Sequence, residues 1–280
     1  MLLSKDSVKR DYDLNFMTYW DKVFSEYKNS AASNRVWFAG PTSYVFSLCG
    51  QKFALDLQVR RKCDFENVRE RLINDTSDLS FVLITHQHDD HMCIPLMREL
   101  KDSPIRWYLP YDTKKSLIDE TELPDDKIVK VHDGDVYKIG NLTVRVFFSP
   151  HVVPGDEPFP QVGYEVISPA GNILFPGDVR DYDHKGYPEF GNVDVCFSHL
   201  WGGDNTIDPE LYTPMLEKFA DMNAGFGAKK YFLCHLYEIG RELKYMWRYS
   251  HAGLAMDLFY ERNPESEVVI PHLGCSYPLF

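Results

Sequence analysis

Short apolar runs separated by turn signals make up most of the first two thirds of the chain. Runs rich in Val, Ile, Leu, Phe and Tyr are typical of strands, and the Gly, Pro and Asn positions between them indicate turns. Strands are therefore predicted over residues 35–39, 43–49, 52–57, 80–85, 105–109, 161–167, 172–175, 193–197, 229–234 and 267–270, and within 128–149.

Helical spacing of apolar residues predicts an N-terminal amphipathic helix over about 13–30, with Asp13 as its N-cap. Its apolar face either covers the rest of the domain or contacts another subunit, and the pattern leaves both roles open. The apolar positions are Phe16, Trp20, Val23, Phe24 and Tyr27. Further helices are predicted over residues 66–74, 95–101, 113–119 and 210–223, and a helical C-terminal region over about 237–262.

The order of these elements predicts one α/β domain that spans residues 1–280. Two blocks of mostly antiparallel strands, each accompanied by helices, fit a four-layer αββα sandwich. In such a sandwich two mixed sheets pack face to face and helices cover their outer faces. The hydrophobic pattern alone does not select this fold, so the choice depends on the residues that could carry out chemistry.

The composition and net charge of the chain limit the kinds of binding partner and cellular location that we expect. Hydrophobic residues make up 44% and charged residues 26% of the chain, as in globular proteins. No apolar run reaches the length of a membrane span or of a signal peptide, so we expect a cytoplasmic protein without a membrane partner. The six cysteines contain no C-x-x-C pair and suit free thiols. The net charge of −12 disfavours nucleic acid, and the short basic run 60–62 is expected to be a solvated loop.

Histidines and aspartates cluster directly after the strand predicted at 80–85. Between His86 and His91, three imidazoles and two carboxylates fall within six positions. Because these groups contribute no apolar surface and are costly to bury unpaired, a bound metal is the economical explanation. In an extended segment His86 and His88 point to the same side, and a turn can bring Asp90 and His91 beside them.

The motif His86-x-His88-x-Asp90-His91 resembles the signature of the metallo-β-lactamase superfamily. The further positions of the family pattern have matches in the right order at Asp56, His151, Asp178 and His235. The resemblance runs from about residue 35 to about residue 240 and implies the four-layer αββα sandwich.

The resemblance also implies a centre of two divalent metal ions. One ion would be bound by His86, His88 and His151, the other by Asp90, His91 and His235, and Asp178 would bridge them. Asp56 would orient the cluster from behind the ligands. Nitrogen and oxygen donors suit zinc, although manganese or iron could occupy the same cage. His199 also ends a strand and is the alternative to His235 as the last ligand.

Two adjacent divalent ions lower the pKa of a shared water and polarise the bond that it attacks. We therefore expect a hydrolase in which a dinuclear-metal-bound hydroxide cleaves an ester, lactone or phosphoester bond of a small anionic metabolite. Asp90 could share a proton with the hydroxide, and His199 could assist the leaving group. The candidates for binding substrate are Arg180, His184, Trp201, Tyr237 and Arg241, although Trp and Tyr at helical spacing more often belong to the core.

Within the superfamily the chain is most similar to the L-ascorbate-6-phosphate lactonase-like branch, which shares its early aromatic helix and helical C-terminal tail. The alternatives are a phosphodiesterase of the cyclic-nucleotide or nucleic-acid type and a non-hydrolytic di-iron redox protein. The acidic charge disfavours a nuclease. A di-iron member would be expected to carry Glu at the position of His88. Assembly into a homo-oligomer is compatible with the sequence.

Overall fold

The computed structural model describes residues 7–30, 33–59, 65–151, 160–182, 186–203, 205–238 and 241–280. His184, one of the candidates for binding substrate, and the basic run at 60–62 lie outside the described residues.

Two seven-stranded sheets form the centre of the molecule. The first sheet has, in spatial order, β14 (Ser276–Pro278), β1 (Arg35–Phe38), β2 (Tyr44–Leu48), β3 (Gln51–Leu55), β4 (Phe81–Leu83), β5 (Arg106–Pro110) and β6 (Ile128–Val131). The second has β13 (Glu267–Val269), β12 (Lys230–Cys234), β11 (Val195–His199), β10 (Gly171–Phe175), β9 (Val162–Ser168), β8 (Leu142–Phe148) and β7 (Val136–Ile139).

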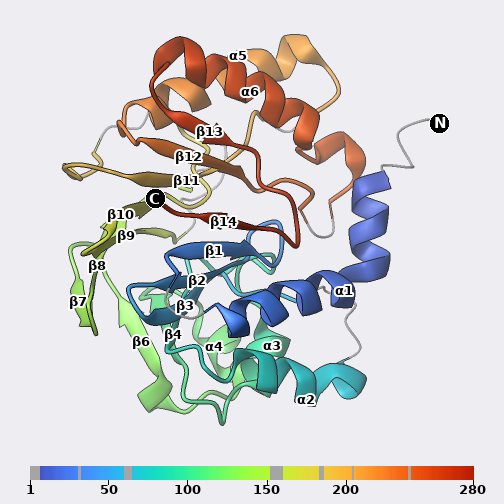
Figure 1. Ribbon diagram of the computed structural model, residues 1–280, viewed down its shortest axis with the longest axis vertical. Coiled ribbons are helices and arrows are strands. Elements are labelled where there is room, and N and C mark those ends of the chain that lie inside the picture. Colours follow the sequence, from blue (N-terminus) through green and yellow to red (C-terminus); the bar gives the residue numbers. More distant parts are fainter. Residues whose placement is uncertain are drawn as a thin grey trace.

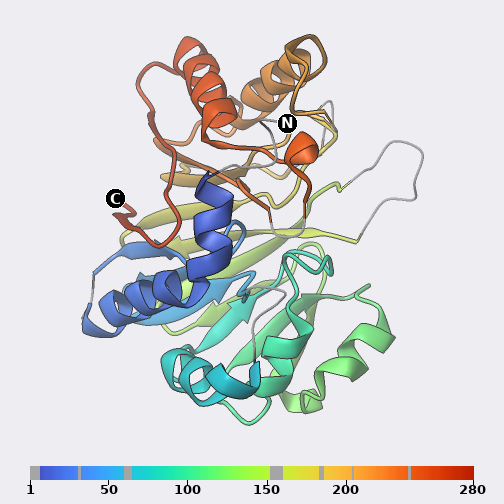
Figure 2. The same ribbon diagram turned by 90° about the vertical axis from the view of Figure 1, so that its right-hand side faces the viewer.

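Helices cover the outer faces of both sheets, as Figure 1 and the perpendicular view in Figure 2 show. The first sheet is covered by α1 (Ser7–Asn29), α2 (Phe65–Thr76), α3 (Ile94–Glu99) and α4 (Lys115–Thr121). The second is covered by α5 (Pro209–Ala224) and α6 (Tyr249–Arg262), and short 3-10 turns lie at Asp125–Lys127 and Leu243–Tyr245. None of the helices in the described segments is long and apolar enough to cross a membrane.

Three separate apolar clusters fill the three gaps between these four layers, which confirms the predicted αββα sandwich. The middle cluster lies between the sheets and is rich in aromatic residues. Phe53 on β3 stacks on Phe46 of β2 at 4.7 Å between ring centroids and on Phe81 of β4 at 4.8 Å. These three residues are directly paired across their strands, so one ladder of rings fixes the register of the strands that lead into the histidine motif.

The sheets contain more parallel pairing than the pattern suggested. In the first sheet, β14, β1, β2 and β3 pair antiparallel, whereas β3, β4, β5 and β6 pair parallel. The second sheet repeats this arrangement, with β7 to β10 antiparallel and β10 to β13 parallel. Parallel neighbours need crossover connections, and helices lie between the strands of each parallel pair except β10 and β11 within the described residues.

Helix α1 begins at Ser7 rather than at Asp13, so Asp13 lies inside the helix and the N-cap prediction was wrong. The helix is kinked at Asn15, where φ is −114° and ψ is 21°. Two helical segments meet at this kink, and the sequence pattern did not predict the first of them. The predicted apolar face is buried within the chain, and the Tyr27 ring lies edge-on to Trp37 of β1 at 5.5 Å. This face therefore covers the first sheet.

Candidate metal centre

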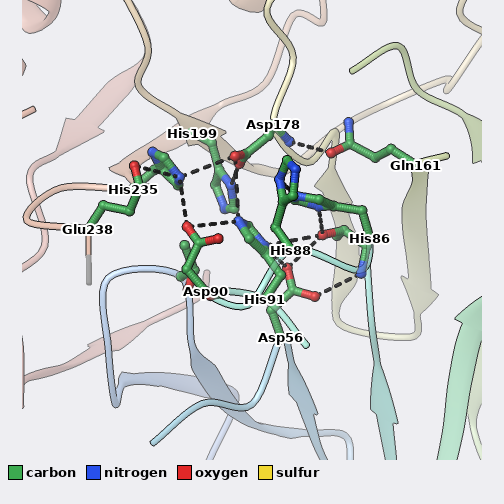
Figure 3. Close-up of polar contacts among 12 residues, drawn as sticks. Asp56, His86, His88, Asp90, His91, Gln161, Asp178, His199, His235 and Glu238 are labelled. Carbon is green, nitrogen blue, oxygen red and sulfur yellow. Dashed lines mark hydrogen bonds and ion pairs between the residues drawn. The ribbon is translucent and has the colours of Figure 1, made fainter. Parts of the chain in front are cut away.

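The predicted ligands meet where strands of both sheets end, between the two halves of the sandwich (Figure 3). His86 follows β4, His151 follows β8, Asp178 follows β10 and His235 follows β12. Strands β8 and β10 run in the same direction because β9 lies antiparallel between them. Their carboxyl ends, and that of β12, therefore open at the same edge of the second sheet.

Asp56 anchors the histidine motif from behind. Its Oδ1 accepts a hydrogen bond from the Thr85 amide at 2.7 Å, and its Oδ2 accepts from the Thr85 hydroxyl at 2.8 Å and from His91 Nδ1 at 2.7 Å. The carboxylate is fully buried, and its residue has a left-handed φ of 46° at the end of β3. Because Nδ1 of His91 is held as a donor, its Nε2 lone pair is directed towards the centre.

His86, His88 and His151 form the first ligand group, with one ring nitrogen of each within 4.8 Å of the others. His86 Nε2 lies 2.9 Å from His88 Nδ1. Burial lowers the pKa of His86 well below its usual value and that of His151 to about 3. These imidazoles are therefore neutral, which is the form that offers a nitrogen lone pair to a metal.

Asp90, His91 and His235 form the second ligand group within the same 4.8 Å limit. Asp90 Oδ2 lies 3.6 Å from the Nε2 atoms of both His91 and His235. Asp178 Oδ2 lies 3.5 Å from His91 Nε2 and 3.2 Å from His235 Nε2. A third group of His86, His91 and Asp178 connects the two halves. Asp178 thus lies between them, where a bridging ligand would be.

The electrostatics of the second group favour a cation. Burial alone would lower the pKa of His235, but Asp178 and Asp90 raise it to about 9. Burial alone would raise the pKa of Asp178, but the nearby His235 and His91 hold it well below its usual value. Two buried carboxylates therefore stay ionised beside positive charge, and a divalent cation can supply that charge.

The residues present fit two metal ions. The Nε2 atoms of His91 and His235 are buried and make no hydrogen bond, although two carboxylates face them. A buried ring nitrogen without a hydrogen bond is costly, and a metal ion among these donors removes that cost. These His and Asp groups are therefore able to bind a dinuclear metal centre, with nitrogen and oxygen donors only.

Asp178 is held by residues that the sequence did not single out. Its backbone amide donates to Gln161 Oε1 at 3.0 Å, and Gln161 lies so close under Gly177 that a Cβ there would be 2.9 Å from its side chain. Gly177 also has a φ of 76°, so the turn before Asp178 requires glycine. Gln161 lies directly before β9, where it forms an isolated antiparallel bridge with His86, and no sequence signal identified it.

His199 lies behind Asp178 and outside the ligand groups, whereas His235 lies within one. Its Nδ1 is 2.7 Å from Asp178 Oδ1, and its Nε2 is 3.0 Å from the Tyr44 hydroxyl. Burial lowers the pKa of His199 despite the nearby carboxylate. A neutral ring therefore donates from Nδ1 to Asp178, which orients the carboxylate, and its Nε2 faces the Tyr44 hydroxyl.

Glu238 is a further residue at the edge of the centre that was not predicted. Its Oε2 lies 3.7 Å from His235 Nε2, and its Oε1 accepts a hydrogen bond from Arg241 Nε. Burial raises the pKa of Glu238. Its position three residues after His235 is the one signal that could have indicated it. Arg241, a predicted substrate-binding residue, is thus paired with a carboxylate.

The other candidates for binding substrate differ in their surroundings. Arg180 lies beside Asp178, and its guanidinium carbon is 5.2 Å from the centre of the Trp201 ring. Trp201 is 8% exposed. Tyr237 is buried, and its ring lies edge-on to Tyr249 at 4.8 Å, so its ring packs within the core.

Comparison with known proteins gives one family match. Residues 58–236 match the family described as the β-lactamase superfamily domain, and the matched segment includes every predicted ligand. A search of curated proteins finds no match.

Solved structures with the same fold include enzymes of different chemistry. CmlA, a diiron β-hydroxylase from Streptomyces venezuelae, is 14% identical with a TM-score of 0.62, and the match covers 89% of this chain and 54% of CmlA. This chain thus spans about half the length of CmlA. A possible metal-dependent hydrolase from Veillonella parvula is 13% identical with a TM-score of 0.61, covering 89% of this chain and 100% of the other. Unliganded yeast PDE1 is 12% identical with a TM-score of 0.52, covering 88% and 99%. At these identities the likeness shows the fold alone.

Proposed function

The chain belongs to the β-lactamase superfamily, and we propose that it is a hydrolase that cleaves an ester, lactone or phosphoester bond in a small anionic molecule. The observation that carries this proposal is the convergence of three overlapping His and Asp groups at the ends of strands from both sheets. The observed grouping supports the ligand assignment made from sequence, in which two triads are joined by Asp178.

In this assignment His86, His88 and His151 hold one ion, and Asp90, His91 and His235 hold the other. Two divalent ions, when bound, supply an activated water and polarise the substrate oxygen. The nitrogen and oxygen donors support zinc, and iron or manganese suits the same donors. His88 stands where a di-iron redox member would be expected to carry Glu, which favours hydrolysis over redox chemistry.

The protein side chains position the reacting groups. Asp56 keeps His91 in the tautomer that directs Nε2 at the centre. Asp90 lies where it can accept a proton from a water held in the site. His199 was predicted to assist the leaving group, but both its ring nitrogens are engaged, by Asp178 and Tyr44. We therefore assign His199 a positioning role through Asp178.

The finer assignments are also proposals. A lactonase-like substrate is supported by the aromatic helix α1 and by the helical C-terminal region around α6. A cytoplasmic location is supported by the free thiols among the described cysteines. A phosphodiester substrate is the second candidate, because the Arg180 guanidinium beside the centre suits phosphate oxygens as well as carboxylates.

Elemental analysis combined with a substrate panel tests this function. We expect about two zinc ions per chain after reconstitution, and zinc-dependent hydrolysis of activated carboxylic esters, lactones or bis(p-nitrophenyl) phosphate. His88→Ala and Asp178→Ala should lose zinc and activity while the chain stays folded. His132→Ala is the control, because this side chain is 54% exposed. Full activity in either ligand variant, or a wild type that hydrolyses no member of the panel, contradicts the proposal.

A further inference from the structure

We propose that Arg180 and Trp201 form an oxyanion-binding subsite beside the metal centre, and that the substrate presents carboxylate or phosphate oxygens to Arg180. This inference rests on the proposed function and adds to it the place of the anionic group. It is carried by a buried guanidinium whose hydrogen-bonding capacity the described residues leave largely unused.

Arg180 lies two residues after Asp178, and its side chain is 8% exposed. Its Nε is buried and makes no hydrogen bond. Among the described residues, the nearest carboxylate oxygen, Asp178 Oδ2, is 4.0 Å from Nη2, which is too long for a hydrogen bond. A guanidinium has five N–H donors, and burying its charge without partners is costly. A bidentate oxyanion would satisfy these donors.

The guanidinium is held in place by an aromatic platform. It lies over the Trp201 ring at 5.2 Å, a geometry that leaves the N–H groups in its plane free to bind. The Trp201 carbonyl accepts a hydrogen bond from the Tyr182 hydroxyl at 2.6 Å. Gly202 lies against Trp247, where a Cβ would be 2.6 Å from the indole. These contacts position the Trp201 ring beside the guanidinium.

Arg241 offers a natural contrast on the other side of the centre. Its Nε is already bound by Glu238, which lies beside His235. Arg180 instead lies beside Asp178, with Nη2 4.0 Å from Asp178 Oδ2, and its guanidinium lies over the Trp201 ring. The two guanidiniums thus differ in availability, and the subsite lies on the Arg180 side.

Anion binding to the zinc-loaded protein tests the subsite without measuring activity. Inorganic phosphate and acetate are titrated calorimetrically into the wild type, Arg180→Met, Arg180→Lys and Arg241→Met. We expect Arg180→Met to weaken binding of the preferred anion by about 10- to 100-fold, because charge-assisted hydrogen bonds are lost. Arg180→Lys should recover part of the affinity, since a lysine keeps the charge but not the planar fork. The anion that binds more tightly identifies whether phosphate or carboxylate is the ligand.

Arg241→Met controls for net charge, since it removes the same charge near the same centre, and it should weaken anion binding less than Arg180→Met does, because the Arg241 guanidinium is already bound by Glu238. Equal losses in Arg180→Met and Arg241→Met would show a general charge effect and overturn the subsite. Unchanged binding in Arg180→Met, or no anion binding to the wild type, overturns it as well. Zinc content and melting temperature confirm that each variant is folded and loaded.

A hydrolysis assay separates this inference from the proposed function. The substrates are p-nitrophenyl acetate and a p-nitrophenyl ester with a terminal carboxylate. In Arg180→Met the KM should rise only for the charged ester, with kcat little changed, because the lost contact serves binding. If the zinc-loaded wild type hydrolyses none of the esters, lactones and phosphodiesters of the panel, the proposed function fails, while the calorimetric result still decides the subsite.

Discussion

Replacing Asp56 with asparagine should weaken metal binding without disturbing the fold. The two side chains have the same shape, and asparagine tolerates the left-handed φ of 46° at this position as well as aspartate does. The Thr85 amide donates to Oδ1 at 2.7 Å, so the asparagine oxygen must face that amide. The asparagine NH2 group then faces His91 Nδ1, which must become an acceptor. His91 consequently carries its proton on Nε2, the atom that faces Asp90 and Asp178.

The size of the effect follows from this change of tautomer. His91 Nε2 cannot bind a metal while it bears a proton, so the proton must first return to Nδ1. The asparagine NH2 group then faces an N–H donor, which is unfavourable. Loss of such a supporting partner typically costs 10- to 100-fold in metal affinity, or about 1.4 to 2.8 kcal/mol. The three hydrogen bonds that converge on the buried carboxylate place Asp56→Asn in the upper part of this range.

Competition with a zinc chelator at fixed pH measures the effect. Asp194→Asn is the matched control, because Asp194 accepts hydrogen bonds from the Asn172 amide and Lys229 at the far end of β11 from His199. Its zinc affinity should equal that of the wild type. If Asp56→Asn retains wild-type zinc affinity, Asp56 does not set the tautomer of His91.

Three further predictions concern stability. Phe53→Ala should lower the free energy of unfolding in urea by about 3 to 5 kcal/mol, because it removes the middle ring of the ladder between the sheets; a loss below about 1 kcal/mol would refute that role. Removing zinc with a chelator should lower the melting temperature reversibly, since ions at 100 times Kd add about 2.7 kcal/mol per independent site; an unchanged melting temperature would argue against binding to the folded state. Burial lowers the pKa of His251 from 6.5 to about 4, so the unfolded chain takes up this proton first as the pH falls. Stability should therefore decrease from pH 6.5 towards pH 4 by up to about 1.4 kcal/mol per unit, and His251→Gln should reduce that slope relative to the wild type.

The sequence identified the candidate ligands because each follows a strand or a tight turn. His86, His88, Asp90 and His91 are contiguous, and their spacing alone indicates a metal site. Asp178 and His235 are separated from them by long stretches, and matching them required the resemblance to a family. The residues that hold the ligands were harder to predict, because contacts such as Gln161 to Asp178 depend on how distant strands pack.

The differences between the predicted and the observed fold have similar causes. Strand β14 was not predicted because it is short and ends in proline, and its pairing with β1 is set by the return of the chain to the edge of the first sheet. The start of α1 was misplaced because Asp13 is of a residue type that often caps helices, whereas the helix continues through it to Ser7 with a kink at Asn15. The parallel strand pairs in each sheet depend on crossover connections, and the hydrophobic pattern does not show in which direction the chain re-enters the sheet.

Anomalous diffraction at the zinc edge, from crystals of the zinc-loaded protein, would locate the metal ions among the predicted ligands. We expect two peaks per chain, one bounded by His86, His88 and His151 and the other by Asp90, His91 and His235, with Asp178 between them. A well-ordered chain without a peak among these side chains, or with zinc bound only elsewhere, would contradict this expectation.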